Sequence, residues 1–219
     1  MIVSRALGLS LLAACCAAWP AASAQAAVIF DSLGDAANGT GSINNTLGAS
    51  FSTVGTPSVL TDVKLDLANR GAGGNTITVS LAADSGTAPG STLALLADVS
   101  DSTLSSSGTV VDVPVSGVSL AAGTRYWVVL ASPVSTDKWE YSDSDAGIGV
   151  AGEYYSDNGV SPNSEGPYLM QVSASPVAAV PEPASLALLG AGLAMVAAGD
   201  AETCIRYGPS EFGETPLSE

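Results

Sequence analysis

The chain of 219 residues contains no histidine. Histidine is the commonest general base and transition-metal ligand in proteins, so its absence argues against most hydrolases and zinc enzymes. Cysteine is also scarce: Cys15 and Cys16 lie near the N-terminus and Cys204 near the C-terminus. The long region between them therefore has no disulfide framework, and a domain there must rely on its hydrophobic core alone.

Basic residues are few as well, since 6 lysines and arginines face 21 aspartates and glutamates, for a net charge of −15. A surface that binds nucleic acid needs clustered lysine and arginine, so we expect no such partner. The acidic balance suits solubility outside the cell and leaves weak calcium binding open as the one cofactor interaction. Asp143-Ser-Asp145 and Asp157-Asn-Gly159 supply oxygen ligands. Neither has the spacing of a calcium loop, so we expect ordinary turns and no dedicated metal site.

The N-terminal segment 1–26 is typical of a secretory signal peptide. Arg5 supplies a short basic region, residues 6–18 are apolar, and small residues follow. Leu12-Ala-Ala-Cys15 leaves an alternative open, because it resembles a lipobox in which Cys15 would be lipidated. Either interpretation predicts an exported protein.

Residues 27–175 are expected to form one all-β domain. Apolar Val63, Leu65 and Leu67 alternate with Lys64 and Asp66, which is the pattern of a half-buried strand. Turn-rich segments at 31–42, 70–75 and 84–91 separate short apolar runs, with no amphipathic helix between them. The pattern predicts strands at 28–30, 49–53, 59–67, 76–81, 93–99, 109–115, within 121–130, at 139–141 and at 168–172. This regular spacing favours an antiparallel β-sandwich, jelly-roll-like, with a glycine- and serine-rich solenoid as the alternative.

The C-terminal part begins with a linker, 176–183, that ends in Val180-Pro181-Glu182-Pro183. An uncharged apolar run at 184–199 follows, and we expect it to form a transmembrane helix. This tail resembles the PEP-CTERM sorting signal of exported bacterial proteins. The resemblance implies recognition by a membrane-embedded exosortase, transient anchoring in the inner membrane, and delivery to the envelope or beyond.

One feature of that signal is missing. A cluster of arginines should follow the apolar helix, yet the segment 200–219 is acidic and carries only Arg206. Basic residues at the cytoplasmic end orient such a helix, so this divergent acidic tail leaves its processing open. Two other interpretations of the run 184–199 are a buried core helix and a plain membrane anchor.

The domain itself resembles a second bacterial family. Three of its segments, 60–67, 77–90 and 120–130, are similar to the "choice-of-anchor" extracellular domains, type R in particular. Members of that family carry interchangeable C-terminal sorting signals. The resemblance implies a β-sandwich without an established biochemical activity, and it transfers no functional residues.

Aromatic residues and carboxylates cluster in sequence between 137 and 155. Such a cluster would suit sugar stacking, but a long polar loop whose aromatic residues cap the sandwich is the more ordinary interpretation. The candidate ligand-binding residues are Trp139, Tyr141, Tyr154 and Tyr155, beside the carboxylates Asp137, Glu140, Asp143, Asp145 and Glu153. We therefore expect a non-enzymatic structural or interaction protein of the envelope, biofilm or exopolysaccharide matrix. A carbohydrate-binding module is the alternative, and a glycan-active enzyme using two carboxylates is a third hypothesis.

Overall fold

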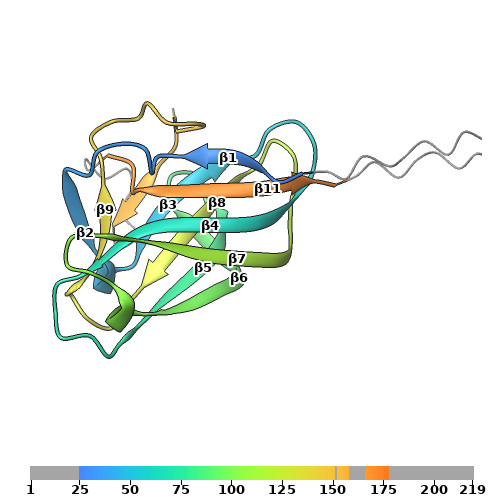
Figure 1. Ribbon diagram of the computed structural model, residues 1–219. Helices are drawn as coiled ribbons and strands as arrows, with labels where there is room; N and C mark the ends of the chain where they lie inside the picture. The colour runs from blue at the N-terminus through green and yellow to red at the C-terminus, as the bar shows by residue number, and fades with distance from the viewer. Residues whose placement is uncertain (1–24, 151, 158–165, 178–219) are drawn as a thin grey trace, which may run out of the picture. The chain divides into compact units, whose positions relative to one another are not determined.

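The computed structural model describes residues 25–150, 152–157 and 166–177, and these form an all-β domain of antiparallel strands (Figure 1). The expected signal helix, apolar C-terminal helix and sorting motif Val180 to Pro183 lie outside the described residues. The elements are β1 Ala27–Asp31, β2 Gly39–Ser42, the 3-10 helix η1 Ile43–Asn45, β3 Leu47–Ser52, β4 Ser58–Asn69, β5 Thr76–Asp84, β6 Pro89–Ser100, the 3-10 helix η2 Asp101–Thr103, β7 Thr109–Leu120, β8 Arg125–Ala131, β9 Asp137–Tyr141, β10 Tyr155–Asp157 and β11 Met170–Pro176.

Two sheets contain all of these strands. One has the order β1-β11-β4-β9-β2, with β7 also paired to β4, and the other has the order β10-β3-β8-β5-β6. Leu67 of β4 pairs with Trp139 of β9 and with Thr109 of β7, so these two strands lie on opposite sides of β4. Strand β9 thus continues the line of β11 along one edge of β4.

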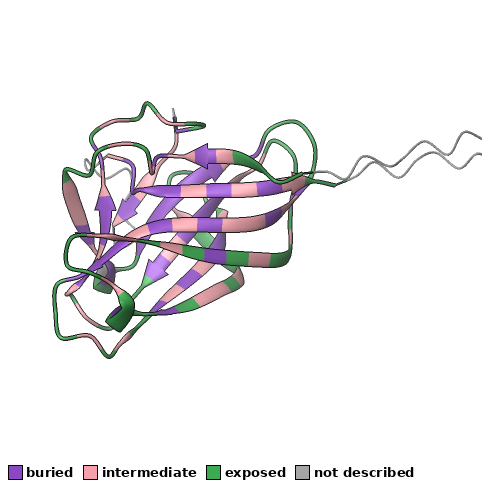
Figure 2. Cartoon of the chain, viewed as in Figure 1, coloured by how far each residue is buried: buried purple, intermediate pink, exposed green. Residues whose placement is uncertain are grey.

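Strand β4 shows most directly how the sequence pattern becomes structure. Val63, Leu65 and Leu67 are fully buried, and the residues between them are only partly buried, as the alternating colours of Figure 2 show. Successive side chains of a strand point to opposite faces, so one face of β4 enters the core and the other faces outward. The predicted strand at 59–67 is confirmed.

The core joins the inner faces of both sheets. Phe30, Leu65 and Val172 come from the first sheet, and Phe51, Leu81 and Leu130 from the second; all belong to one hydrophobic cluster. Burying a side chain of this size contributes roughly 1.5–3 kcal/mol. A core of this kind supplies the stability that the cysteine-free domain needs.

Both ends of the domain emerge side by side. Ala27 at the start of β1 pairs with Ala174 near the end of β11, and the two strands are antiparallel. The loops 53–57 and 121–124 lie at the same end, because Ser58 pairs with Leu120 and Ser52 with Arg125. At this end, which lies on the right in Figure 1, the chain therefore enters and leaves the domain.

Two strands were not predicted, and the expected loop 84–91 is shorter because β6 begins at Pro89. The segment containing β2 was interpreted as turns, since Gly39-Thr-Gly-Ser is rich in turn residues. Glycine is needed there for a different reason. A Cβ on Gly41 would lie 2.6 Å from Leu47 and 2.7 Å from the ring of Tyr168, and one on Gly39 would clash with Tyr141. The second missed strand, β10, is only three residues long.

Candidate functional site

Three of the four candidate aromatic residues converge on Tyr168, which the sequence analysis did not single out as a site residue. The ring of Trp139 stacks on Tyr168 with centroids 4.8 Å apart, and Tyr141 and Tyr155 contact Tyr168 edge-on at 6.2 and 6.5 Å. Trp139 and Tyr168 are fully buried. The Nε1–H of Trp139 donates a hydrogen bond to the Leu169 carbonyl at 3.0 Å. These rings form an internal aromatic cluster.

The four aromatic residues therefore do not form the single row that the carbohydrate-binding alternative requires. Trp139 has no exposed face to offer a ligand, and Tyr154 lies apart from the internal aromatic cluster. Burial, reinforced by the charges of Glu153 and Asp145, raises the pKa of Tyr155 to about 12. Its edge-on contact with Tyr168 makes Tyr155 a packing residue of the internal aromatic cluster.

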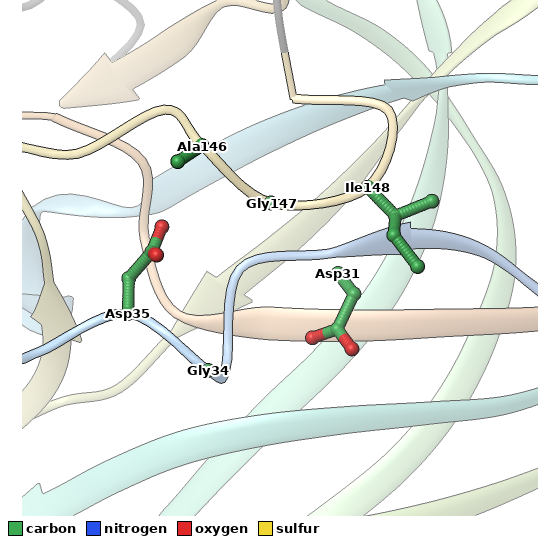
Figure 3. A pocket seen from close by; sticks show the side chains of 6 residues that line it. All are labelled: Asp31, Gly34, Asp35, Ala146, Gly147 and Ile148. Atoms are coloured by element: carbon green, nitrogen blue, oxygen red, sulfur yellow. The ribbon is translucent and has the colours of Figure 1, made fainter.

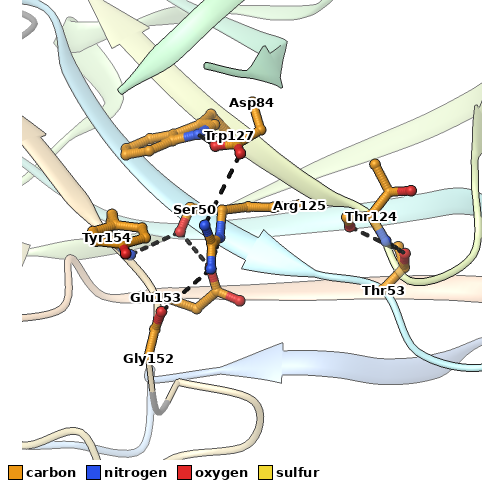
Figure 4. Close-up of polar contacts among 9 residues, drawn as sticks. All are labelled: Ser50, Thr53, Asp84, Thr124, Arg125, Trp127, Gly152, Glu153 and Tyr154. Atoms are coloured by element: carbon orange, nitrogen blue, oxygen red, sulfur yellow. Dashed lines mark hydrogen bonds and ion pairs between the residues drawn. The ribbon is translucent and has the colours of Figure 1, made fainter. Parts of the chain in front are cut away.

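A different polar cluster joins strands β3, β5 and β8 of the second sheet to residues 152–154 (Figure 4). We call it the Arg125 cluster; its members are Ser50, Asp84, Arg125, Trp127, Glu153 and Tyr154. Arg125 Nε donates to Glu153 Oε2 at 3.1 Å, and Arg125 Nη1 lies 4.0 Å from Asp84 Oδ2. The guanidinium also stacks 4.6 Å above the ring of Tyr154.

The charged side chains of the Arg125 cluster are paired with partners inside the cluster. Trp127 donates from Nε1 to Asp84 at 2.8 Å, and the Ser50 hydroxyl donates to Glu153 and accepts the Tyr154 N–H at 2.8 Å. The Glu153 side chain is only 4% exposed. Since a buried carboxylate without a partner is strongly destabilising, these contacts fasten residues 152–154 to the sheet. The cluster unites two candidates, Glu153 and Tyr154, with partners from three strands.

Asp137, another candidate, belongs to a buried acid pair with Asp101. Asp101 accepts the N–H groups of Gly74 and Asn75 at 2.6 and 2.8 Å and the Asn75 amide at 3.1 Å. Burial alone would raise the pKa of Asp101, but these hydrogen bonds outweigh it and hold that pKa below its usual value.

The pKa of Asp137 is shifted in the opposite direction. Its Oδ2 accepts the Ser132 hydroxyl, and Oδ1 has no donor among the described residues. Burial, together with the neighbouring Asp101, raises the pKa of Asp137 above its usual value. The opposite directions of the two pKa shifts mean that Asp137 takes up a proton before Asp101 as pH falls, and a proton on Asp137 can be shared with Asp101 through a hydrogen bond.

Glu140 points to the outer face and lies close to Asp66 and Arg70. Arg70 Nη2 is 3.6 Å from Glu140 Oε1. Burial raises the pKa of Glu140, with Arg70 opposing and Asp66 adding to the shift. Burial also raises the pKa of Asp66, which the Thr109 N–H partly offsets. The remaining candidate carboxylates, Asp143 and Asp145, are exposed in the loop after β9.

Another acid pair, Asp62 and Asp112, bridges β4 and β7 on the outer face. Burial, the hydrogen bond to Asp112 and its charge raise the pKa of Asp62 to about 6, and Lys64, 4.0 Å away, opposes the shift. A raised folded-state pKa adds stability below the unfolded value near 3.8, and this stability is lost as pH rises through about 6.

We therefore expect Asp62→Asn to flatten the pH dependence of stability between about pH 4 and pH 6. Between these pH values the urea midpoint of the wild type should fall more than that of the variant. The difference corresponds to no more than about 1 kcal/mol of unfolding free energy, because solvent screens the pair. The matched control is Asp98→Asn, which removes an exposed carboxylate bonded to Thr78. Parallel curves for wild type and Asp62→Asn would contradict a raised pKa of Asp62 in the folded domain.

A cavity of about 190 Å³ lies beside the carboxylates Asp31 and Asp35 (Figure 3). Asp31 already accepts the Leu33 N–H at 3.0 Å and the Gln171 amide at 2.8 Å. In Figure 3 the two carboxylates point in different directions. Among the described residues, no three acidic or cysteine side chains are grouped so as to hold a metal ion.

Comparison with known proteins adds no assignment: no protein-family model matches the chain, and no curated protein sequence matches it either. Within the described ranges, no helix is long and apolar enough to cross a membrane.

Proposed function

We propose that this protein is an exported, non-enzymatic structural or interaction protein of a bacterial envelope, biofilm or exopolysaccharide matrix. A PEP-CTERM-like tail delivers it. In this proposal an exosortase-type enzyme recognises Val180 to Pro183, and the run 184–199 holds the chain transiently in the inner membrane. The observation that carries the proposal is the extent of the folded domain. Its strands begin at Ala27 and end at Pro176, and so fill the interval between the two sorting segments.

The placement of the domain ends supports the same proposal. A chain attached to one membrane by a signal peptide and by a C-terminal helix needs both attachments at one side of its domain. Ala27 and Ala174 are paired neighbours, so the geometry allows both attachments without unfolding a strand.

We further propose that the fold is a jelly roll, which agrees with the choice-of-anchor resemblance. With the short strands β2, β9 and β10 set aside, eight strands remain. Their order is first-eighth-third-sixth in one sheet and second-seventh-fourth-fifth in the other. This order is that of two Greek keys wrapped into a sandwich. Jelly rolls serve many functions, so the fold by itself selects none of them.

The non-enzymatic assignment is supported by how the carboxylates are used. Asp101 and Asp137 are fully buried and bonded to the loops around them, and Glu153 is paired with Arg125. A glycosidase needs two carboxyl groups across an open cleft, about 5–10 Å apart, with room for sugar and water. The carbohydrate-binding alternative is weakened because Trp139 is buried in the core and has no free face for a sugar.

The proposal is tested by changing the sorting motif in the full chain. Pro181→Ala combined with Pro183→Ala removes the rigid segment before the apolar run, so we expect the protein to accumulate in the membrane fraction. Cells that contain an exosortase should release wild-type protein into the medium, as detected by immunoblotting. The matched control is Pro176→Ala, a proline before the motif. Equal release of wild type and the double variant would contradict the proposal.

A further inference from the structure

The end of the sandwich where the chain enters and leaves, which we call the entry face, has an unusual composition. Three loops form it: 53–57, 85–88 and 121–124. Their sequences are Thr-Val-Gly-Thr-Pro, Ser-Gly-Thr-Ala and Ala-Ala-Gly-Thr. None carries a charge, although the whole chain has a net charge of −15.

The opposite end of the domain is different. Asp35 and Arg70 stand in the loops 32–38 and 70–75, which follow the far ends of β1 and β4. Charged groups close to the entry face are Arg125, at the start of β8, and its partners Asp84 and Glu153. These are paired with one another in the Arg125 cluster, so they do not form a free acidic surface.

Three exposed apolar side chains lie at the same end, and others lie elsewhere on the domain. Val54 is 78% exposed, Val177 is 51% exposed and Val28 is 38% exposed. The N–H of Val177 donates to the Pro57 carbonyl at 2.9 Å, which holds the last described residue against the loop 53–57. Between them lies a cavity of about 150 Å³, lined in part by Ile29, Thr56 and Pro176, with no charged residue in its wall.

We propose that the entry face is a membrane-contacting surface that lies against the lipid headgroups while the protein is held by its tail. This inference rests on the proposed function, because it requires the run 184–199 to enter the bilayer. Only residues 178–183 separate Val177 from that run. Six extended residues reach about 20 Å, so the tether keeps the entry face close to the membrane.

The absence of charge is what suits the entry face to the lipid. Anionic lipid headgroups repel acidic protein surfaces, and an uncharged face removes that repulsion. Burial of three valines at the headgroup boundary adds a weak attraction. Weak attraction suffices for a tethered domain, since the tether makes the contact intramolecular. The domain would then stand upright, with its charged far end directed away from the membrane.

The inference is tested on the full chain inserted into vesicles of phosphatidylethanolamine and phosphatidylglycerol. The native cysteines are replaced (Cys15→Ser, Cys16→Ser, Cys204→Ser), and a single fluorophore is attached through Val54→Cys at the entry face. The matched control is Ala72→Cys, exposed in the loop 70–75 at the far end. Strand β4 has 12 residues and so separates these ends by about 40 Å. Flotation reports anchoring, and quenching by headgroup-labelled lipid reports proximity.

We expect quenching at Val54→Cys at least about threefold stronger than at Ala72→Cys, because only the first label lies within the interfacial layer. Adding Val28→Glu should reduce the quenching at Val54→Cys, and Val110→Glu, on an exposed residue of β7, should not. If the chain floats with the vesicles but both labels are quenched equally, the membrane-contacting surface is wrong and the anchoring proposal stands. If the chain does not float, the anchoring proposal fails, and the inference fails with it.

Discussion

Trp139→Ala should destabilise the domain by about 3–5 kcal/mol, the usual effect of truncating a buried tryptophan. The substitution removes the stacking partner of Tyr168, the hydrogen bond to the Leu169 carbonyl and a fully buried side chain. Single domains are typically stable by about 5–15 kcal/mol, so the loss brings this domain near its limit. Urea unfolding followed by circular dichroism measures the change.

A graded series makes this result interpretable. Trp139→Phe keeps an aromatic ring but loses the donor, so we expect a loss of roughly 1–2 kcal/mol. The control Val110→Ala, at a residue 56% exposed, should change stability by less than about 0.5 kcal/mol. If Trp139→Ala instead weakened polysaccharide binding while leaving stability unchanged, Trp139 would be a ligand-binding residue after all.

The second large effect is expected at the buried acid pair, where the same amide substitution should have opposite consequences. Asp101→Asn loses the charge that accepts the shared proton and places an amide against the side-chain amide of Asn75. We expect the urea midpoint to drop by roughly 1 M. Asp137→Asn supplies a permanent donor to Asp101 and keeps an oxygen for the Ser132 hydroxyl. It should leave the midpoint at neutral pH unchanged or higher.

The pH dependence of the pair separates the two roles. Asp101 has a lowered pKa, so the stability it contributes is present above the unfolded value near 3.8 and is lost as pH falls. Asp137 has a raised pKa, so its contribution is lost as pH rises through its folded value. Asp137→Asn should abolish only the second loss. An equal loss of stability in both variants at all pH values would show that no proton is shared.

The sequence predicted the domain well where burial alternates along a strand. In β4 the alternation of apolar Val63, Leu65 and Leu67 with polar residues predicts both a strand and its buried face, because it follows directly from strand geometry. Strand β2 was missed because its glycines accommodate aromatic rings contributed by distant residues, Tyr141 and Tyr168. Contacts of that kind depend on pairing across the fold and leave no local signature.

The four candidate aromatic residues do not share one face of the domain, for a related reason. Neighbours in a strand point to opposite faces, so Trp139 enters the core while Glu140 points outward. Tyr154 and Tyr155 also point in different directions: Tyr154 lies under Arg125, and Tyr155 contacts Tyr168. The partners that complete these groups, Arg125 among them, come from other strands. Clustering in sequence therefore did not show which of these side chains meet in space.

The central claim is that an exported β-domain is delivered by its sorting tail, and the intact mass of the mature protein tests it most directly. Protein recovered from culture medium and from membranes is measured by mass spectrometry in cells that contain an exosortase. The account predicts a secreted species that begins near Ala27 and ends near Pro183. A membrane species that still ends at Glu219, with no shorter form in the medium, would contradict it and make the run 184–199 a plain anchor.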